Sequence, residues 1–124
     1  IQTVLNKAIE YISLSKQNFS FSFKKDRYSI PFNKICYIQK RGRKAYIYTD
    51  KKTYECNLNL KKIWEKLEEK SFVSIGNSCI VNISKIEEIQ SEHVILENDK
   101  KLVVSREYRT ALKKKHLEYY REQM

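Results

Sequence analysis

Three short stretches of this chain collect the side chains best suited to recognising another molecule. They are the basic run at 39–44, the Asn77-Ser78 corner, and the segment from Ser105 to Arg109. Arginine can fork onto the O6 and N7 acceptors of guanine, and the asparagine amide donates and accepts side by side, as an adenine edge requires. Each stretch therefore has a nucleic-acid interpretation. A solvated surface, or a self-contained turn at Asn77, explains the same residues.

Reactive groups for catalysis are scattered along the chain. The acidic residues fall mostly in predicted turns or on a helix surface, and His93 and His116 lie in different predicted elements. The sequence contains no nucleophile elbow, kinase-like set or Walker-type phosphate loop. Cys36, Cys56 and Cys79 are odd in number and widely spaced, which argues against disulfides and zinc and favours small core side chains in a reducing cytosol. We expect no enzymatic activity, no metal and no cofactor.

Charge and length restrict the partner and the size of the fold. The chain has 124 residues with 25 Lys and Arg against 15 Asp and Glu, a formal net charge of +10. This length suits one domain with its own core. The charge predicts an anionic partner, nucleic acid before an acidic membrane surface. Because no apolar run approaches the roughly 20 residues of a membrane span and no signal peptide is visible, we expect a cytoplasmic protein.

Short strands are predicted to position the three stretches. About nine or ten are expected, and the short turns between them favour antiparallel pairing. Alternation and β-branched runs predict strands at 19–23, 28–32, 35–38, 46–48, 53–58, 72–75, 79–83, 93–97 and 102–104, with one more short strand that ends at 89. The basic run at 39–44 is then a loop between two strands. Gly76 and Asn77 are residue types that tolerate a positive φ in a tight turn.

Helical spacing appears in three places. Asn59 is a plausible N-cap, and Leu60, Ile63, Trp64 and Leu67 then predict a helix over 60–70 with Trp64 in the core. A stripe of apolar residues in 1–17 predicts an N-terminal helix, and another pattern, beginning at Tyr108, predicts a C-terminal one. The expected fold class is mainly β, with one internal helix and flanking N- and C-terminal helices.

The stretch from Phe72 to Ile86 resembles a known family. Its pattern F-x-x-x-x-N-S-x-x-V-N, followed by Ser-Lys-Ile, is similar to the LytTR DNA-binding domain, the output module of many bacterial response regulators. The resemblance extends over about residues 19–112 and implies an elongated antiparallel multi-sheet domain. It includes Ile35 to Ile38, Asn59 to Ile63 and Leu102 to Arg106. Ser74 and Gly76 depart from the pattern, since many members carry Arg and His there.

The resemblance implies that loops, rather than a recognition helix, enter double-stranded DNA. In the family these are the loop after the third strand, the Asn-Ser corner, and the Ser-Arg/Lys segment before the last helix. Carried over, the implied base contacts fall near Arg43 or Lys44, between which the alignment of the loop does not choose, on Asn77 and on Arg106. The candidates for backbone contacts are Lys40, Arg41, Ser78, Ser105, Arg109 and Lys113.

The resemblance also implies a division of the chain. Residues 19–124 would be the DNA-binding domain, and residues 1–18 a helix and linker left from a receiver domain. The chain begins at Ile1, which we interpret as the mark of a fragment. Similar regulators bind direct-repeat promoter sites, and a phosphorylated receiver would drive the pairing of two copies on DNA.

Two other functions fit the residues. A basic β domain with Tyr46 and Tyr48 on alternate strand positions could stack the bases of RNA or of single-stranded DNA. A protein-interaction or membrane-surface module would instead use the positive face against an acidic partner. The three functions can be distinguished by competition. Duplex DNA should bind best to a DNA-binding domain, single strands to a single-strand binder, and anionic vesicles or heparin to an interaction module.

Overall fold

The computed structural model describes residues 18–67 and 71–123, so the predicted N-terminal helix lies outside the described residues. Within them the fold is mainly β with antiparallel pairing, which confirms the expected class. The strands are β1 (Asn18–Phe23), β2 (Asp26–Pro31), β3 (Ile35–Arg41), β4 (Lys44–Thr49), β5 (Thr53–Cys56), β6 (Phe72–Gly76), β7 (Cys79–Asn82), β8 (Ile86–Ile89), β9 (His93–Leu96) and β10 (Lys101–Val103). The helices are α2 (Leu60–Lys66) and α3 (Arg109–Gln123), with 3-10 turns η1 (Phe32–Lys34), η2 (Ile83–Lys85) and η3 (Arg106–Tyr108).

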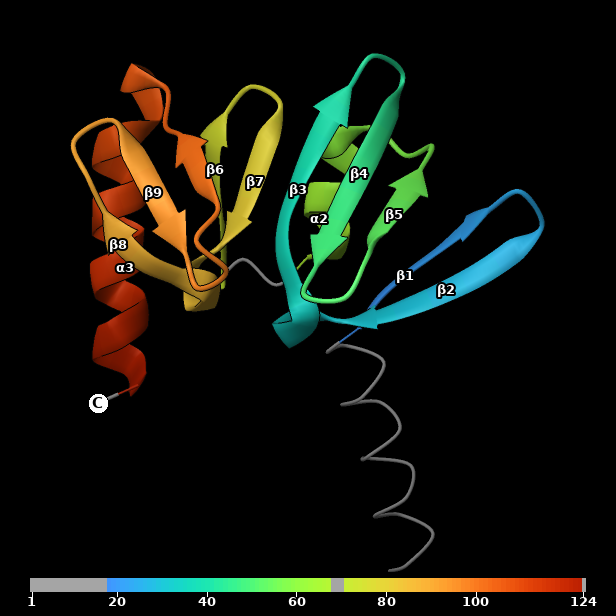
Figure 1. Ribbon diagram of the computed structural model, residues 1–124, viewed down its shortest axis with the longest axis horizontal. Helices are drawn as coiled ribbons and strands as arrows, with labels where there is room; N and C mark the ends of the chain where they lie inside the picture. The colour runs from blue at the N-terminus through green and yellow to red at the C-terminus, as the bar shows by residue number, and fades with distance from the viewer. Residues whose placement is uncertain (1–17, 68–70, 124) are drawn as a thin grey trace, which may run out of the picture.

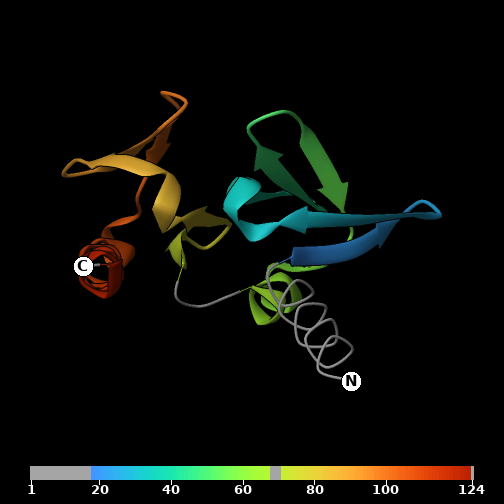
Figure 2. The ribbon, with the colours of Figure 1, turned by 90° about the horizontal axis from the view of Figure 1, so that it is seen from below.

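The strands form a hairpin and two larger sheets along one elongated axis (Figures 1 and 2). The hairpin is β1-β2, the central sheet has the order β5-β4-β3-β7-β6, and the third sheet is β10-β9-β8. Strand β3 holds the centre because it pairs with β4, its neighbour in sequence, and with β7 from much later in the chain. This long-range pairing brings the turn after β3 beside the turn between β6 and β7.

Both faces of the central sheet are buried, each by its own core. Phe19, Ile38 and Ile63 belong to the core that joins the β1-β2 hairpin and α2 to one face. Val81 and Leu112 belong to the core that joins the β8-β10 sheet and α3 to the other. Burial on both sides explains why β3, β6 and β7 carry nearly continuous apolar runs instead of clean alternation.

Several predicted boundaries change in the structure. Asn59 does cap α2, since its side chain accepts from the backbone N–H of Lys62 at 2.8 Å. The helix ends at Lys66, because Leu67 is already extended, so the prediction of a helix through residue 67 was wrong, and 68–70 lie outside the described residues. Trp64 is half-buried at the edge of its core, below the Lys115 ammonium at 5.2 Å from the ring centre.

The turn between β6 and β7 forms without a left-handed residue. Neither Gly76 nor Asn77 has a positive φ among the described residues. Gly76 pairs with Cys79, which leaves Asn77 and Ser78 as the two turn residues, and the register shifts by one residue at Ile75. The bulge, rather than a left-handed residue, gives this hairpin its direction.

Asn82 is buried at 1% exposure, the one polar side chain in the core of the described residues. Its Nδ2 donates to the carbonyls of Phe32 and Ile35 at 3.1 and 2.8 Å. Its Oδ1 accepts from the backbone N–H and the hydroxyl of Ser84 at 3.0 and 2.8 Å. The amide thus ties the end of β7 to the start of β3 and to η2, with both of its ends satisfied.

We expect Asn82→Ala to lower the free energy of unfolding by about 2–3 kcal/mol, because it leaves two carbonyls and two Ser84 donors without their partner. Asn33→Ala, at an exposed asparagine in the neighbouring η1, is the matched control and should stay within about 0.5 kcal/mol. Urea denaturation measures both. Equal midpoints for the two variants would contradict the role given to Asn82.

Candidate nucleic-acid interface

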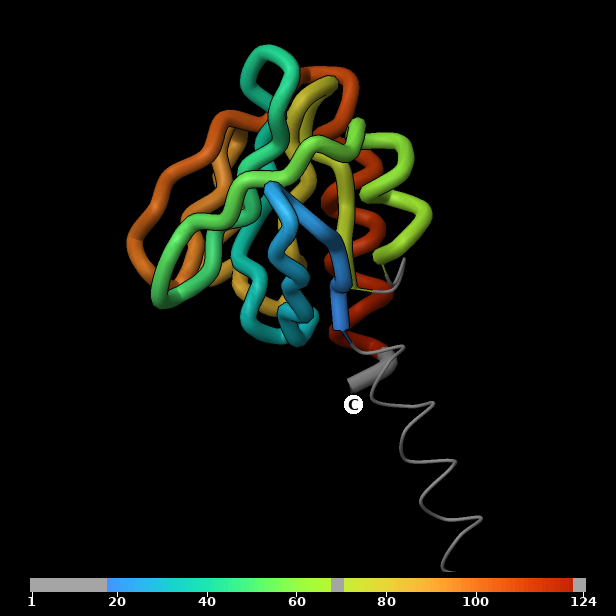
Figure 3. The backbone as a smooth tube through the Cα atoms, turned by 90° about the vertical axis from the view of Figure 1, so that its right-hand side faces the viewer, coloured from blue at the N-terminus to red at the C-terminus, as the bar shows by residue number. Residues whose placement is uncertain are grey.

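The three stretches singled out from the sequence meet along one edge of the molecule. The β3-β4 turn, the β6-β7 turn and η3 all lie along the top in Figure 1, and the tube in Figure 3 shows the same grouping from the side. We call this row of turns the tip edge: residues 40–44, 76–79 and 104–109. It runs along the long axis of the domain, so the tips lie beside one another instead of facing a common centre.

The first tip is a tight hairpin and not the loop predicted at 39–44. Strand β3 continues to Arg41, which pairs with Lys44, so only Gly42 and Arg43 form the turn. Gly42 has φ 63°, a left-handed value that a residue without Cβ adopts cheaply. Extending both strands stiffens the tip and presents Lys40, Arg41 and Arg43 as exposed side chains.

Lys44 lies on the same hairpin but is engaged within the domain. Its ammonium is 3.3 Å from Glu55 Oε2 and lies 5.8 Å from the centre of the Phe23 ring. Both partners belong to neighbouring strands, β5 and β1. Of the two residues between which the sequence left the first base contact open, Arg43 is therefore the one at the turn itself.

Backbone hydrogen bonds join the three tips to one another. The N–H of Lys40 donates to the Ser78 carbonyl at 2.8 Å, which links the first tip to the second. The N–H of Ser105 donates to the Ile75 carbonyl at 2.9 Å, which links the second to the third. Ile75 is the residue at the β6 bulge, so its carbonyl is free of the β7 ladder and available to Ser105.

Gly76 allows the second and third tips to approach closely. A Cβ built on Gly76 would lie 3.3 Å from the Ser105 hydroxyl oxygen, tighter than an ordinary van der Waals contact. Across the same gap, the Tyr108 hydroxyl donates to Asn77 Oδ1 at 2.8 Å. Asn77 and Ser78 themselves are exposed.

The third tip carries Arg106, exposed at the start of η3. Arg109 is partly buried, and its Nε donates to the Val104 carbonyl at 3.1 Å, so it braces the turn from β10 into α3. The exposed Ser105 precedes η3, and Lys113 is exposed on α3, one helical turn beyond Arg109. The Arg106 side chain is thus exposed to solvent, whereas the Arg109 guanidinium is partly occupied by a hydrogen bond within the domain.

A shallow hollow of about 250 Å³ lies next to the tip edge. Its walls include Leu60, Trp64 and Ile80, with Lys61, Asn77 and Tyr108 supplying polar atoms. Lys61 lies outside the three stretches singled out from the sequence, and Tyr108 lies within the third but was not among the residues expected to contact DNA. Tyr108 had been explained by its place in the apolar pattern of the C-terminal helix, and nothing local to it indicates a contact with Asn77.

Comparison with known proteins identifies the family of this chain. The family model of the LytTr DNA-binding domain matches residues 25–116. The chain is a member of the LytTR family of DNA-binding domains. Among solved structures it is similar to the LytTr DNA-binding domain of a putative methyl-accepting/DNA response regulator from Bacillus cereus, with 21% identity, a TM-score of 0.69, and coverage of 80% of this chain and 95% of that one. No curated protein matches.

Two thiols of this LytTR domain have raised pKa values. Burial raises the pKa of the Cys79 thiol, at the second tip, to about 12. Burial, with a hydrogen bond to Asp50, raises the pKa of Cys36 to about 11. Across residues 18–67 and 71–123 there is no group of His, Cys, Asp and Glu able to hold a metal ion. No helix there is long and apolar enough to cross a membrane.

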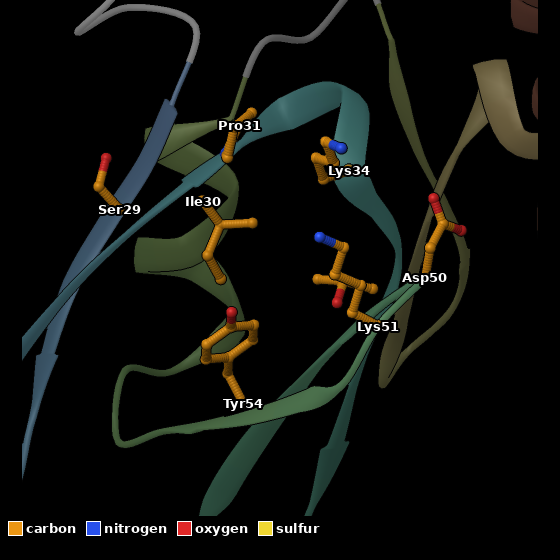
Figure 4. Close-up of a pocket in the computed structure, with 8 residues that line it drawn as sticks. Ser29, Ile30, Pro31, Lys34, Asp50, Lys51 and Tyr54 are labelled. Atoms are coloured by element: carbon orange, nitrogen blue, oxygen red, sulfur yellow. The ribbon is translucent and has the colours of Figure 1, made fainter.

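A second hollow of the LytTR domain, about 170 Å³, lies at the opposite end from the tips, between η1, the end of β2 and the β4-β5 turn. Figure 4 shows Lys34 and Lys51 on one side of it and Ile30 and Tyr54 on the other. Its distance from the tip edge separates it from the residues that the sequence predicted to touch DNA.

Arg43 and Lys44 should respond differently to truncation, since only Lys44 has an internal ion pair. We expect Arg43→Ala to weaken binding to a preferred duplex by about 1–3 kcal/mol. We expect Lys44→Ala to weaken it by less than about 1 kcal/mol, the range of an exposed charge pair. Fluorescence anisotropy with a labelled duplex measures both. A larger loss for Lys44→Ala would reverse the assignment at this tip.

Proposed function

We propose that this chain is the sequence-specific DNA-binding output domain of a two-component response regulator and regulates transcription. The family supports DNA binding as the activity. The observation that carries the proposal further is the tip edge, where Arg43, Asn77 and Arg106 come from three distant parts of the sequence to one side of the domain. We propose that these tips, rather than a helix, enter the grooves of duplex DNA.

The positive charge of the tip edge also supports its placement against DNA. Lys40, Arg41, Arg43 and Arg106 are all exposed on the tip edge. Cations placed against the phosphate backbone release counterions and hold the domain in register, while base edges are read by the few directional donors. Arg43 and Arg106 suit guanine, and Asn77 can donate to a base acceptor. No cofactor or metal is needed for this activity.

The single-strand alternative has less support from Tyr48, one of the two tyrosines on which it rests. Tyr48 stacks on Tyr37 with ring centres 4.2 Å apart and planes at 10°, so one face of its ring is already covered. Tyr37 is buried, and burial followed by the neighbouring Tyr48 raises its pKa to about 12. The Tyr48 ring therefore packs within the fold and is not an open platform for stacking bases.

We also propose that residues 1–18 lead from a receiver domain and that two copies pair on direct-repeat sites. The exposed Glu87 and Glu88 lie on β8, and the exposed Lys24 and Lys25 lie at the β1-β2 turn, at opposite ends of the long axis of the domain (Figure 1). Copies placed head to tail along DNA would bring unlike charges together.

Pairing predicts that a duplex with two tandem sites binds the second copy more tightly than the first. The expected sign is an increase, because unlike ends meet only when both sites are filled. Titration of one-site and two-site duplexes in gel shifts measures it. Equal affinity per site at every tested spacing would contradict pairing through this domain.

Arg106 gives the sharpest test of sequence-specific duplex binding. Selection of bound duplexes from a random pool first defines the preferred site. Arg106→Ala should then cost about 1–3 kcal/mol on that site and much less on random duplex. Arg106→Lys keeps the charge and loses the planar fork, so it should lose the preference at one base position.

Three outcomes would count against the proposal. A domain that selects no sequence, or that prefers single strands over duplex in competition, lacks the proposed function. If Arg106→Lys keeps the full preference, Arg106 contacts phosphate or nothing, and the base contact at the third tip is wrongly assigned.

A further inference from the structure

Tyr108 and Asn77 form a pair that the folded chain creates across the tip edge. Their positions are 31 residues apart in the sequence, and the Tyr108 hydroxyl donates to Asn77 Oδ1 at 2.8 Å. Asn77 is exposed at the turn, whereas Tyr108 is half-buried and packs against the core shared with α3. An anchored side chain therefore holds one that faces solvent.

The anchor itself is well fixed. The backbone N–H of Tyr108 donates to the Ser105 carbonyl at 2.9 Å, and the N–H of Ser105 donates to the Ile75 carbonyl at 2.9 Å. Arg109, the next residue, holds the Val104 carbonyl through its Nε at 3.1 Å. The phenol is thus set by the same contacts that join the second and third tips.

The hydrogen bond decides which end of the Asn77 amide is presented. The terminal torsion of an asparagine is broad and roughly two-fold, so a free amide at a turn presents either its oxygen or its NH₂. A phenol hydroxyl can donate or accept, and in the structure the Tyr108 hydroxyl donates to Oδ1, which sets the orientation of the amide. With Oδ1 held by Tyr108, the amide offers two N–H donors away from the hydroxyl and keeps one oxygen lone pair.

We propose that Tyr108 is a positioning residue for base recognition: it orients Asn77 so that Nδ2 donates to an acceptor on a base in the major groove. This inference rests on the proposed function. Guanine and adenine present N7, and thymine presents O4, whereas cytosine presents only its N4 amino donors. An amide fixed with its NH₂ outward meets cytosine donor against donor. Asn77 therefore selects against cytosine at its position.

The test removes one oxygen atom. The position read by Asn77 is defined as the base pair whose preference disappears in Asn77→Ala. Tyr108→Phe should lose about threefold to tenfold of the discrimination against cytosine there, the scale of one hydrogen bond. Binding to random duplex, the preference that depends on Arg106, and the melting temperature should not change. Tyr120→Phe, on an exposed tyrosine of α3, is the matched control.

A double-mutant cycle separates positioning from direct contact. In the Asn77→Ala background, Tyr108→Phe should have no further effect on base preference, because there is no amide left to orient. Additive losses would mean that Tyr108 touches DNA itself, and the proposal would be wrong. Full discrimination against cytosine in Tyr108→Phe would overturn it as well.

Asn77→Asp provides a second test that does not depend on how the phenylalanine variant folds. The carboxylate still accepts from Tyr108, but it replaces the NH₂ by an acceptor, so preference should shift toward cytosine, whose N4 donates. A shift in any other direction would contradict the assigned orientation. A wild-type domain with no base preference would remove the proposed function itself, whereas preserved preference with unresponsive variants removes only this inference.

Discussion

The arrangement of the tips depends on the amide of Asn82. Two of its hydrogen bonds fasten the end of β7 to η1 and the start of β3, and two fasten it to Ser84 in η2, at the end of the sheet away from the tips. A one-residue slip of β7 would turn its buried side chains to the wrong face. With the register fixed as Tyr37↔Val81 and Ile38↔Ile80, the turn at Ser78 arrives beside Lys40 and bonds to it. A buried contact at one end thus sets the geometry at the other.

Burial of both sheet faces leaves the strand ends as the exposed, rigidly supported part of the domain. The two cores cover the central sheet with the β1-β2 hairpin and α2 on one side, and with the β8-β10 sheet and α3 on the other. The faces are therefore occupied by packing, and α2, with seven residues from Leu60 to Lys66, covers one core through Ile63. The exposed backbone turns remain, on a rigid support that suits precise contacts. A mainly β domain can recognise a groove in this way without a recognition helix.

Much of this could be predicted from the sequence, because the signals were local. Strand alternation, the Asn59 cap and the change from strand β10 to helix α3 each depend on a few neighbouring residues. The details of the tips could not be predicted. The Lys44–Glu55 pair and the Tyr108–Asn77 bond depend on strands meeting in a particular register. The roles of the candidate residues toward DNA stay predictions, whereas the length of the first hairpin had to be corrected.

The central claim is that the tip edge, and not a helix or a sheet face, meets DNA. Titration of an isotopically labelled domain with a selected duplex, followed by backbone amide chemical shifts, tests it most directly. The account predicts that the largest shifts fall at 40–44, 76–79 and 104–109, and that β8, β9 and the β1-β2 hairpin change little. Largest shifts along α2, along the outer face of α3, or around the hollow at Lys34 and Lys51 would contradict it.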